Sequence, residues 1–321
     1  MLLRYRADLR TLLWATAMPV VALTPYFQPQ WSLRLTVVSC YLALAAGVIA
    51  HNHNHCPTFK NRKLNTVFGY WLSIFYGYPV FAWVPTHNLN HHKYVNKAGD
   101  ATITWRHTNR HNWLVASTYF YVSSYYQSDP IKAYIRNAKA GNKTLYRSII
   151  RQYVIWAGAH VALFSIACLH FGFWQGARIW VFAFGLPAFF ALWTIMLFNY
   201  IQHVHTDPWS DHNHSRSFQG KLINFLLFNN GLHAAHHEKA GAHWSTLPAL
   251  HAHLSPNIAP ELQPYGFFAW CFRSYVLAPF LPSFGTRQVG RAPFDDPTSK
   301  RVDVTSADVE ALEPGINALR V

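Results

Sequence analysis

Long apolar stretches alternate with polar, histidine-rich stretches along this 321-residue chain. Four apolar stretches approach the length of about 20 residues that a membrane-spanning helix needs. They cover residues 12–26, 33–50, 153–173 and 177–200. Short connections at 27–31 and 174–176 join them in pairs. The pattern therefore predicts an all-α integral membrane protein with four transmembrane helices in two hairpins. A cleaved signal peptide over residues 1–30 is the alternative for the first stretch, but no small-residue cleavage site precedes a polar start.

A fifth apolar stretch, residues 67–84, is broken by Gly77 and Pro79 and is rich in Trp and Tyr. If it crossed the bilayer, the histidines before and after it would lie on opposite sides. Because Trp and Tyr favour the membrane interface, we expect an in-plane or re-entrant helix here. Residues 113–126 and 267–281 are predicted to be further interfacial segments. The composition becomes polar from residue 285, which predicts a membrane domain over 1–284 and a solvated tail over 285–321.

The charge distribution predicts the orientation in the membrane. The chain has 27 Lys and Arg against 13 Asp and Glu, a formal charge of +14, yet only 12% of its residues are charged. So few charges cannot cover the surface of a soluble protein of this size. The two short turns contain no Lys or Arg, whereas the remaining polar segments contain many. The positive-inside rule therefore places both termini and the long loops in the cytoplasm. Anionic headgroups account for the excess of positive charge better than nucleic acid does.

Twenty histidines are the main candidate chemistry, and four clusters of them lie near the ends of apolar stretches. Histidines four apart share one helix face, while His92 is rotated by about 100° from His91, as expected when neighbours serve different ions. One such pair alone is better explained as a solvated face. Burying four clusters without partners would cost roughly 1–3 kcal/mol for each imidazole, which a metal would remove. The clusters are His51, His53 and His55; His87, His91 and His92; His203 and His205, after Asn199; and His233, His236 and His237.

The other metal-ligating residue types are scarce. Only seven of the 13 carboxylates precede residue 295, and no Glu-x-x-His pair occurs. A carboxylate-bridged diiron bundle is therefore excluded, and histidine must supply most of any metal site. The four cysteines contain no CxxC pair, which argues against a disulfide framework and a thiolate zinc site.

The clusters resemble the histidine boxes of the membrane fatty acid desaturase and hydroxylase superfamily, HxxxH, HxxHH or HxxxHH, and HxxHH, with one more histidine after the last span. The resemblance covers about residues 35–255. One departure is the three-residue gap between His87 and His91, where many members have two residues. Asn199 resembles a weak or water-mediated ligand, and His53 and His205 are expected to orient ligands or water. The nine ligands that the resemblance implies are His51, His55, His87, His91, His92, His203, His233, His236 and His237.

The resemblance implies a cytoplasmic non-haem diiron site that uses O2 to oxidise a fatty acid, acyl thioester or lipid chain taken from the membrane. No catalytic residue is expected apart from the metal site. Desaturation is the leading expectation, and hydroxylation or oxidative decarboxylation to a terminal alkene are the alternatives. The segment after the third box resembles a bacterial branch that includes such decarboxylases, so we expect the bacterial inner membrane.

Reduction of O2 requires electrons, and the chain contains no GxGxxG, HPGG or iron–sulfur motif. We therefore expect an external donor, such as an acidic ferredoxin with its reductase, for which a basic cytoplasmic face is suitable. A zinc hydrolase is disfavoured because Gly241 interrupts an HExxH motif begun by His237 and Glu238. A metal transporter is disfavoured because the histidines lie outside the spans, without intramembrane carboxylates.

Overall fold

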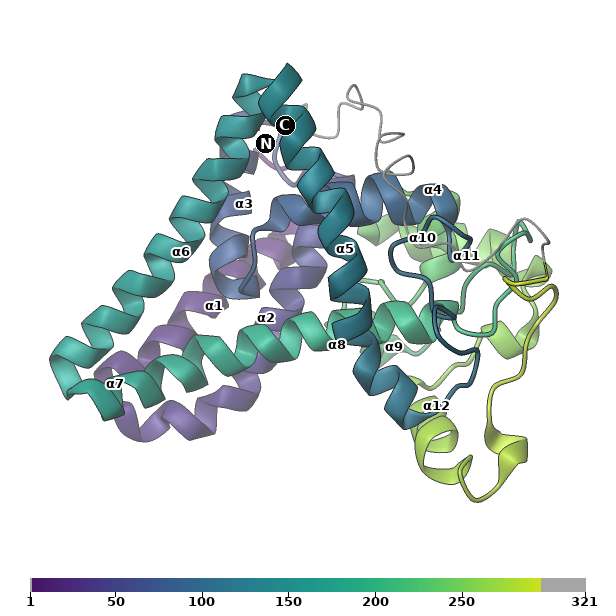
Figure 1. Ribbon diagram of the computed structural model, residues 1–321. Coiled ribbons are helices and arrows are strands. Elements are labelled where there is room, and N and C mark those ends of the chain that lie inside the picture. Colours follow the sequence, from purple (N-terminus) through teal and green to yellow (C-terminus); the bar gives the residue numbers. More distant parts are fainter. Residues whose placement is uncertain (1, 296–321) are drawn as a thin grey trace. The chain divides into compact units, whose positions relative to one another are not determined.

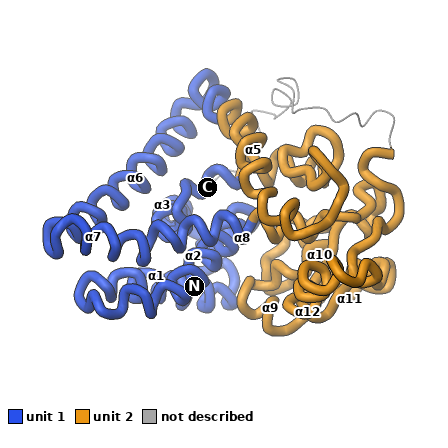
Figure 2. The backbone as a smooth tube through the Cα atoms, turned by 60° about the horizontal axis from the view of Figure 1, so that its bottom comes forward, with its two compact units in different colours: residues 1–83, 135–195, 314–321 blue, residues 84–134, 196–313 orange. Residues whose placement is uncertain are grey.

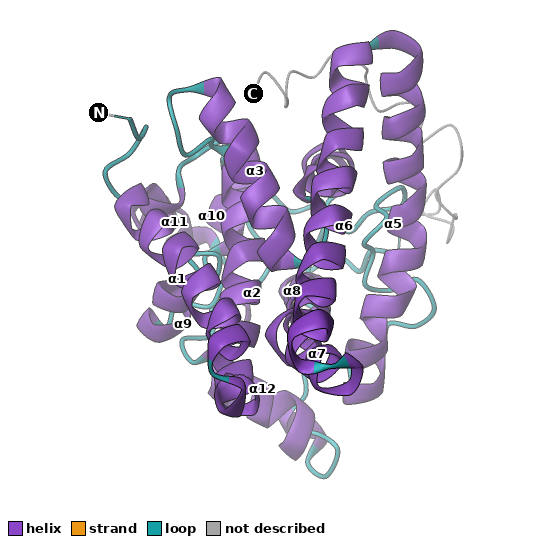
Figure 3. Cartoon of the chain, turned by 90° about the vertical axis from the view of Figure 1, so that its left-hand side faces the viewer, coloured by secondary structure: helices purple, strands orange, loops and turns teal. Residues whose placement is uncertain are grey.

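A computed structural model describes residues 2–295 of the chain. These residues form helices joined by loops and contain no β-strand, which confirms the all-α prediction (Figures 1 and 3). The α-helices are α1 (Asp8–Phe27), α2 (Ser32–His55), α3 (Arg62–Tyr76), α4 (His92–Tyr94), α5 (Trp113–Gly141), α6 (Lys143–Phe171), α7 (Phe173–Trp180), α8 (Leu186–His203), α9 (Lys221–Leu226), α10 (His233–Glu238), α11 (Leu247–Leu254) and α12 (Phe267–Cys271). The short 3-10 segments are η1 (Pro29–Trp31), η2 (Val80–Ala82), η5 (Trp244–Thr246), η6 (Ser255–Asn257), η7 (Pro260–Leu262) and η9 (Pro282–Phe284), and the π-helical segments are η3 (Val84–His91), η4 (Val181–Gly185) and η8 (Phe272–Leu277).

The described chain divides into two compact units (Figure 2). Unit 1 comprises residues 2–83 and 135–195, and unit 2 comprises residues 84–134 and 196–295. The division falls inside the continuous helices α5 and α8. Unit 1 therefore holds most of the long apolar helices, and unit 2 holds the second and third histidine boxes.

Unit 1 contains two helical hairpins. Helices α1 and α2 are joined by η1, and α6 and α7 pack closely on each other. A buried cluster joins the hairpins, and the hydroxyl of Tyr26 donates a hydrogen bond to the Leu163 carbonyl at 3.2 Å. The cluster contains Ala22, Tyr26, Ala167, Ile179, Ala183 and Phe184.

The turn of the second hairpin differs from the prediction. Helix α6 ends at Phe171 and α7 begins at Phe173, so the turn is at Gly172 and residues 174–176 are helical. Gly172 has φ of 78°, a left-handed conformation that glycine adopts without strain. A Cβ atom on Gly176 would lie 2.4 Å from the Cys168 nitrogen, so this glycine allows α7 to approach α6. The sequence shows both glycines, but only the packing of α7 on α6 shows that Gly172 forms the turn and Gly176 the close contact.

Three helical segments are long and apolar enough to cross a membrane: Pro29–His55, Lys143–Phe171 and Phe173–His203. Only 6% of the apolar window of Lys143–Phe171 is buried within the protein, and an apolar surface of that size requires lipid or another protein to cover it. The predicted span at 12–26 is helical, as α1, but is not among the three, because Arg10, three threonines and two prolines reduce its apolar character. The predicted number of four spans is therefore not confirmed.

The ambiguous stretch at 67–84 is broken in the structure. Helix α3 begins at Asn61, whose side chain accepts hydrogen bonds from the backbone of Lys63 and Leu64. It ends at Gly77, and the segments Arg62–Tyr76 and Val80–Tyr94 are bent by 101° at the break. Such a pair is either a broken span or a re-entrant loop, and counting it as one span would bring the total to four. The in-plane or re-entrant helix stays a prediction.

Residues 286–295, expected to begin a solvated tail, contact other parts of unit 2. The Val289 nitrogen donates to the His205 carbonyl at 3.1 Å, and the Arg291 nitrogen donates to Asp207 Oδ2 at 3.0 Å. The Arg291 guanidinium also lies 4.4 Å from the centre of the Trp209 ring. The rest of the predicted tail, 296–321, lies outside the described residues.

Candidate metal centre

Four histidines of unit 2 converge on one point. His91 lies at the end of η3, His203 at the end of α8, and His233 and His237 one turn apart on α10. One ring nitrogen of each lies within 4.8 Å of the others. The Nε2 atoms of His203 and His233 are 2.9 Å apart, and those of His91 and His203 are 3.1 Å apart. The sequence predicted all four as ligands, and the fold brings them together.

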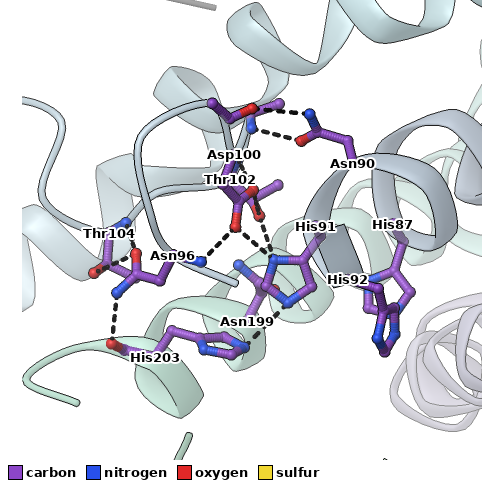
Figure 4. Close-up of polar contacts among 12 residues, drawn as sticks. His87, Asn90, His91, His92, Asn96, Asp100, Thr102, Thr104, Asn199 and His203 are labelled. Carbon is purple, nitrogen blue, oxygen red and sulfur yellow. Dashed lines mark hydrogen bonds and ion pairs between the residues drawn. The ribbon is translucent and has the colours of Figure 1, made fainter. Parts of the chain in front are cut away.

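Hydrogen bonds to Nδ1 fix the tautomers of two of these rings, and Figure 4 shows the one between His91 and Asp100. His91 Nδ1 lies 2.8 Å from Asp100 Oδ2, and His203 Nδ1 lies 3.1 Å from the His214 carbonyl. A carboxylate and a carbonyl can only accept, so each Nδ1 carries the hydrogen and each Nε2 presents a lone pair. Two lone pairs 3.1 Å apart cannot form a hydrogen bond. A cation that both nitrogens bind explains the contact, so these residues fit a metal ion.

A second group in unit 2 contains His87, His92 and His236. Their Nε2 atoms are 3.0–3.3 Å apart in pairs. The adjacent residues His91 and His92 therefore belong to different groups, as do His236 and His237. This arrangement is the one expected if neighbouring imidazoles serve different ions.

The unusual spacing of the second box is absorbed by a π-helical turn. In α10, the first and last histidines of the box, His233 and His237, are four apart and belong to one group. In the second box the corresponding pair, His87 and His92, is five apart. Segment η3 is π-helical, with i to i+5 hydrogen bonding, and this winding aligns residues five apart. Despite the extra residue, the first and last histidines of the second box therefore lie together, as they do in the third box.

The first box lies in unit 1. His51 and His55 occupy the last turns of α2 and share a face, with ring centroids 4.8 Å apart. His53 points elsewhere: its Nδ1 lies 2.9 Å from Thr58 Oγ1 and accepts from the Thr58 nitrogen at 3.2 Å. His53 thus holds the turn after α2, and its predicted role in orienting ligands or water stays a prediction.

Asp100 is the main site residue that sequence reasoning missed. It is fully buried and accepts hydrogen bonds from the Asn96 nitrogen, at 2.8 Å, and from the Thr102 nitrogen and Oγ1, at 2.7 and 2.6 Å. Burial by itself raises the pKa of Asp100, but His91 and these donors outweigh it and lower the pKa to about 2. Asp100 is therefore a fixed negative charge behind a metal ligand. The available signal was an isolated carboxylate eight residues after the second box, in a chain with few carboxylates.

Asn199 contacts the site through other residues. Its amide donates to the Tyr119 hydroxyl at 2.9 Å, and that hydroxyl donates to the Thr102 carbonyl. Thr102 Oγ1 in turn lies 3.0 Å from His91 Nδ1. Asn199 therefore supports the residues that hold His91, and its predicted role as a water-mediated ligand stays a prediction.

Arg216 fixes the end of helix α8, where His203 lies. Its guanidinium donates to the Ile201 carbonyl and, at 3.2 Å, to the Val204 carbonyl, while its own nitrogen donates to the Gln202 carbonyl at 2.6 Å. The His203 carbonyl accepts from Asn96 Nδ2 at 3.0 Å. The carbonyls of residues 201–204, at the end of the helix and just after it, thus all have donors, as a buried helix end requires. Burial lowers the pKa of Arg216 to about 10, which leaves it charged at neutral pH.

His205 does not contact the ligands either. Its Nε2 donates to the Asn109 carbonyl at 2.7 Å, and its Nδ1 lies 2.8 Å from Thr286 Oγ1. Both ring nitrogens are thus engaged in joining loops of unit 2. The predicted role of His205 in orienting ligands or water stays a prediction.

The fold and the site define a helical membrane protein with clustered imidazoles that fit metal ions. A family model described as "Fatty acid desaturase" matches residues 29–269, and the chain belongs to this family. A protein named "Fatty acid desaturase" from Bacillus subtilis (strain 168) is 23% identical over 266 residues, which cover 74% of each chain. No solved structure matches the chain. The protein is therefore an oxidoreductase of the fatty acid desaturase family, and its histidine groups are suited to the iron expected for that family.

Proposed function

We propose that this protein desaturates a fatty acyl chain at a site with two iron ions. The observation that supports the proposal most is the convergence of His91, His203, His233 and His237, two of which have tautomers that direct lone pairs toward one another. The group of His87, His92 and His236 supplies ligands for a second ion. The family pattern adds His51 and His55, which brings the proposed set to nine.

The bound iron would supply the activation of O2 and the removal of hydrogen from an unactivated C–H bond. The protein favours the neutral form of His237, because burial and neighbouring histidines lower its pKa well below the usual value. Asp100 retains the proton on His91 Nδ1 and balances part of the positive charge. Burial of His91 and His203, which are 1% and 0% exposed, keeps water from competing for their Nε2 atoms.

The remaining partners follow from the same chemistry. O2 is the co-substrate, and a ferredoxin-like carrier with its reductase supplies the electrons. The substrate is a fatty acid or acyl thioester drawn from the membrane. The distribution of Lys and Arg supports a location in the bacterial inner membrane, with the metal site and both termini in the cytoplasm.

Product analysis tests the proposed reaction. Cells that express the protein are supplied with isotope-labelled free fatty acids or thioester precursors, and the products are identified by mass spectrometry. We expect an internal double bond at unchanged chain length. A hydroxyl group would indicate hydroxylation, and a terminal alkene one carbon shorter would indicate decarboxylation. All three reactions begin with the same hydrogen removal, so the product identifies which of them occurs. Either of these two products would replace desaturation as the proposed reaction. His233→Ala should abolish the product, and His253→Ala, at an exposed position, serves as its control.

A further inference from the structure

A continuous series of aromatic rings crosses unit 2. Trp113, at the start of α5 and 53% exposed, lies 5.6 Å from Tyr275 between ring centroids. Tyr275 lies 5.0 Å from His111, and His111 stacks on Tyr200 at 5.7 Å. Tyr200 then lies 5.1 Å from Tyr119. Each separation is within the range of rings in contact.

The inner end of the series reaches a metal ligand. The Tyr119 hydroxyl donates to the Thr102 carbonyl, and Thr102 Oγ1 lies 3.0 Å from His91 Nδ1. Tyr119 is 5% exposed and Tyr200 is fully buried. The series therefore connects the exposed surface at Trp113 with the residues behind His91, and every member belongs to unit 2.

Tyr200 has a partner that can hold a proton. Its hydroxyl lies 3.3 Å from His111 Nδ1. Burial, followed by the charges of Arg216 and His205, lowers the pKa of His111 to about 3, so its imidazole is neutral. An oxidised phenol is a very strong acid and gives its proton even to a weak base. A buried tyrosine can lose an electron readily only beside such an acceptor, because an unpaired buried charge is costly.

We propose that Tyr119, Tyr200 with His111, Tyr275 and Trp113 form an electron relay that protects the metal centre when O2 is activated without an acyl chain in place. The inference rests on the proposed function, because it requires a centre that activates O2. The relay gives the protein a second role. It reduces the oxidant that forms at the metal centre when no acyl chain is present to consume it. Electron transfer falls off steeply with distance, so rings in contact provide a faster route than the surrounding aliphatic side chains.

Tyr200 gives one electron toward the metal centre through Tyr119, and its proton moves to His111 Nδ1. Trp113 replaces that electron by transfer across the rings of Tyr275 and His111, and the proton returns from His111 to Tyr200. Tyr275 keeps its own proton, because its buried hydroxyl has no hydrogen-bond acceptor among the described residues. A soluble thiolate reduces the oxidised Trp113, and two thiyl radicals combine into a disulfide. Each electron supplied is matched by one proton from solvent at the centre, so that O2 leaves as water.

The test maps oxidative damage in the full-length, iron-loaded protein. The protein is incubated with O2 and its electron donor but without a fatty acid or thiol, and oxygen-addition products are located by peptide mass spectrometry. In the wild type we expect damage at Trp113, the exposed end of the series. In Tyr200→Phe, which preserves the ring but is not oxidisable, we expect damage to move to His91 and its neighbours and inactivation to be severalfold faster.

Two further variants complete the design. Trp113→Phe should accumulate damage at Tyr200, because the electron lost there is no longer replaced, and Tyr121→Phe, on the same helix but outside the series, should behave as the wild type. A freeze-quenched sample should show a tyrosyl radical by electron paramagnetic resonance in the wild type and lose it in Tyr200→Phe. Identical damage maps in the wild type and Tyr200→Phe, with normal O2 uptake, would overturn the relay alone. Absence of donor-dependent O2 uptake in the wild type would overturn the proposed function and the relay with it.

Discussion

His91 Nδ1 lies 2.8 Å from Asp100 Oδ2, and the two side chains are 1% and 0% exposed. The carboxylate accepts hydrogen bonds from His91, from Asn96 and twice from Thr102. These four bonds occupy all the lone pairs of its two oxygens. The pair fixes the tautomer of one metal ligand and places a negative charge directly behind it. Positions that orient ligands in this way contribute strongly to metal affinity.

Replacement of Asp100 by Asn should weaken iron binding by about 10–100-fold, the usual effect of losing such a partner. The amide NH2 group would face at least one donor, and the negative charge behind His91 would be lost. Iron affinity is measured by competition with a chelator. Asp129→Asn, at an exposed carboxylate near Lys132, should leave the affinity unchanged. An Asp100→Asn protein with wild-type affinity would show that the carboxylate has no role in holding the ligand.

Removal of His203 or His236 should release iron while the protein still inserts into the membrane. The two residues belong to different histidine groups, so each substitution to Ala removes one ligand from one group. We expect lower iron content by elemental analysis and loss of product in both variants, with normal abundance in the membrane fraction. His253→Ala, at an exposed position, is the matched control. Full activity in either ligand variant would refute its assignment.

Arg216→Lys should destabilise the end of α8 although the charge is retained. A lysine ammonium cannot reproduce the planar fork that reaches both the Ile201 and Val204 carbonyls. One buried carbonyl is then left without a donor, at a cost of about 1–3 kcal/mol. We expect a lower thermal unfolding temperature in detergent and reduced iron content. Arg273→Lys, at an exposed position, should change neither. An unchanged unfolding temperature in Arg216→Lys would contradict the capping role.

The stability of the metal-free protein should decrease as the pH falls below 6.5. Burial lowers the pKa of His214 from 6.5 to about 4 and that of His111 to about 3. Between these values and 6.5 the unfolded chain binds more protons than the folded protein. The free energy of unfolding therefore falls with decreasing pH, by about 1.4 kcal/mol per pH unit for each such histidine. The effect of His214 ends near pH 4, and that of His111 near pH 3.

Thermal unfolding in detergent between pH 7 and pH 5 measures this dependence. His214→Asn should reduce the slope, because it removes one group that stays neutral when folded. His253→Asn should leave the slope as it is, since His253 is exposed. A stability that does not change over this range would argue against buried neutral imidazoles at both positions.

The sequence by itself determined the helical fold, the family and the four histidine clusters. Apolar stretches of membrane length can only be helices in lipid, because each backbone group must be satisfied within its own segment. The spacing of histidines along a helix determines which of them share a face, as in His233 and His237. These are local properties, and local sequence is enough to predict them.

The tertiary structure decided what lies behind the ligands. Asp100 and Thr102 lie in the loop after α4 and Tyr119 lies in α5, and only folding brings them to His91. The extra residue between His87 and His91 marks an irregularity in the second box, but only the structure shows that a π-helical turn absorbs it and aligns His87 with His92. His53 and His205 lie inside the motifs, yet their hydrogen bonds hold loops. A motif shows which residues can bind a metal, but the rotation of each side chain and the partners of its second nitrogen depend on packing between distant parts of the chain.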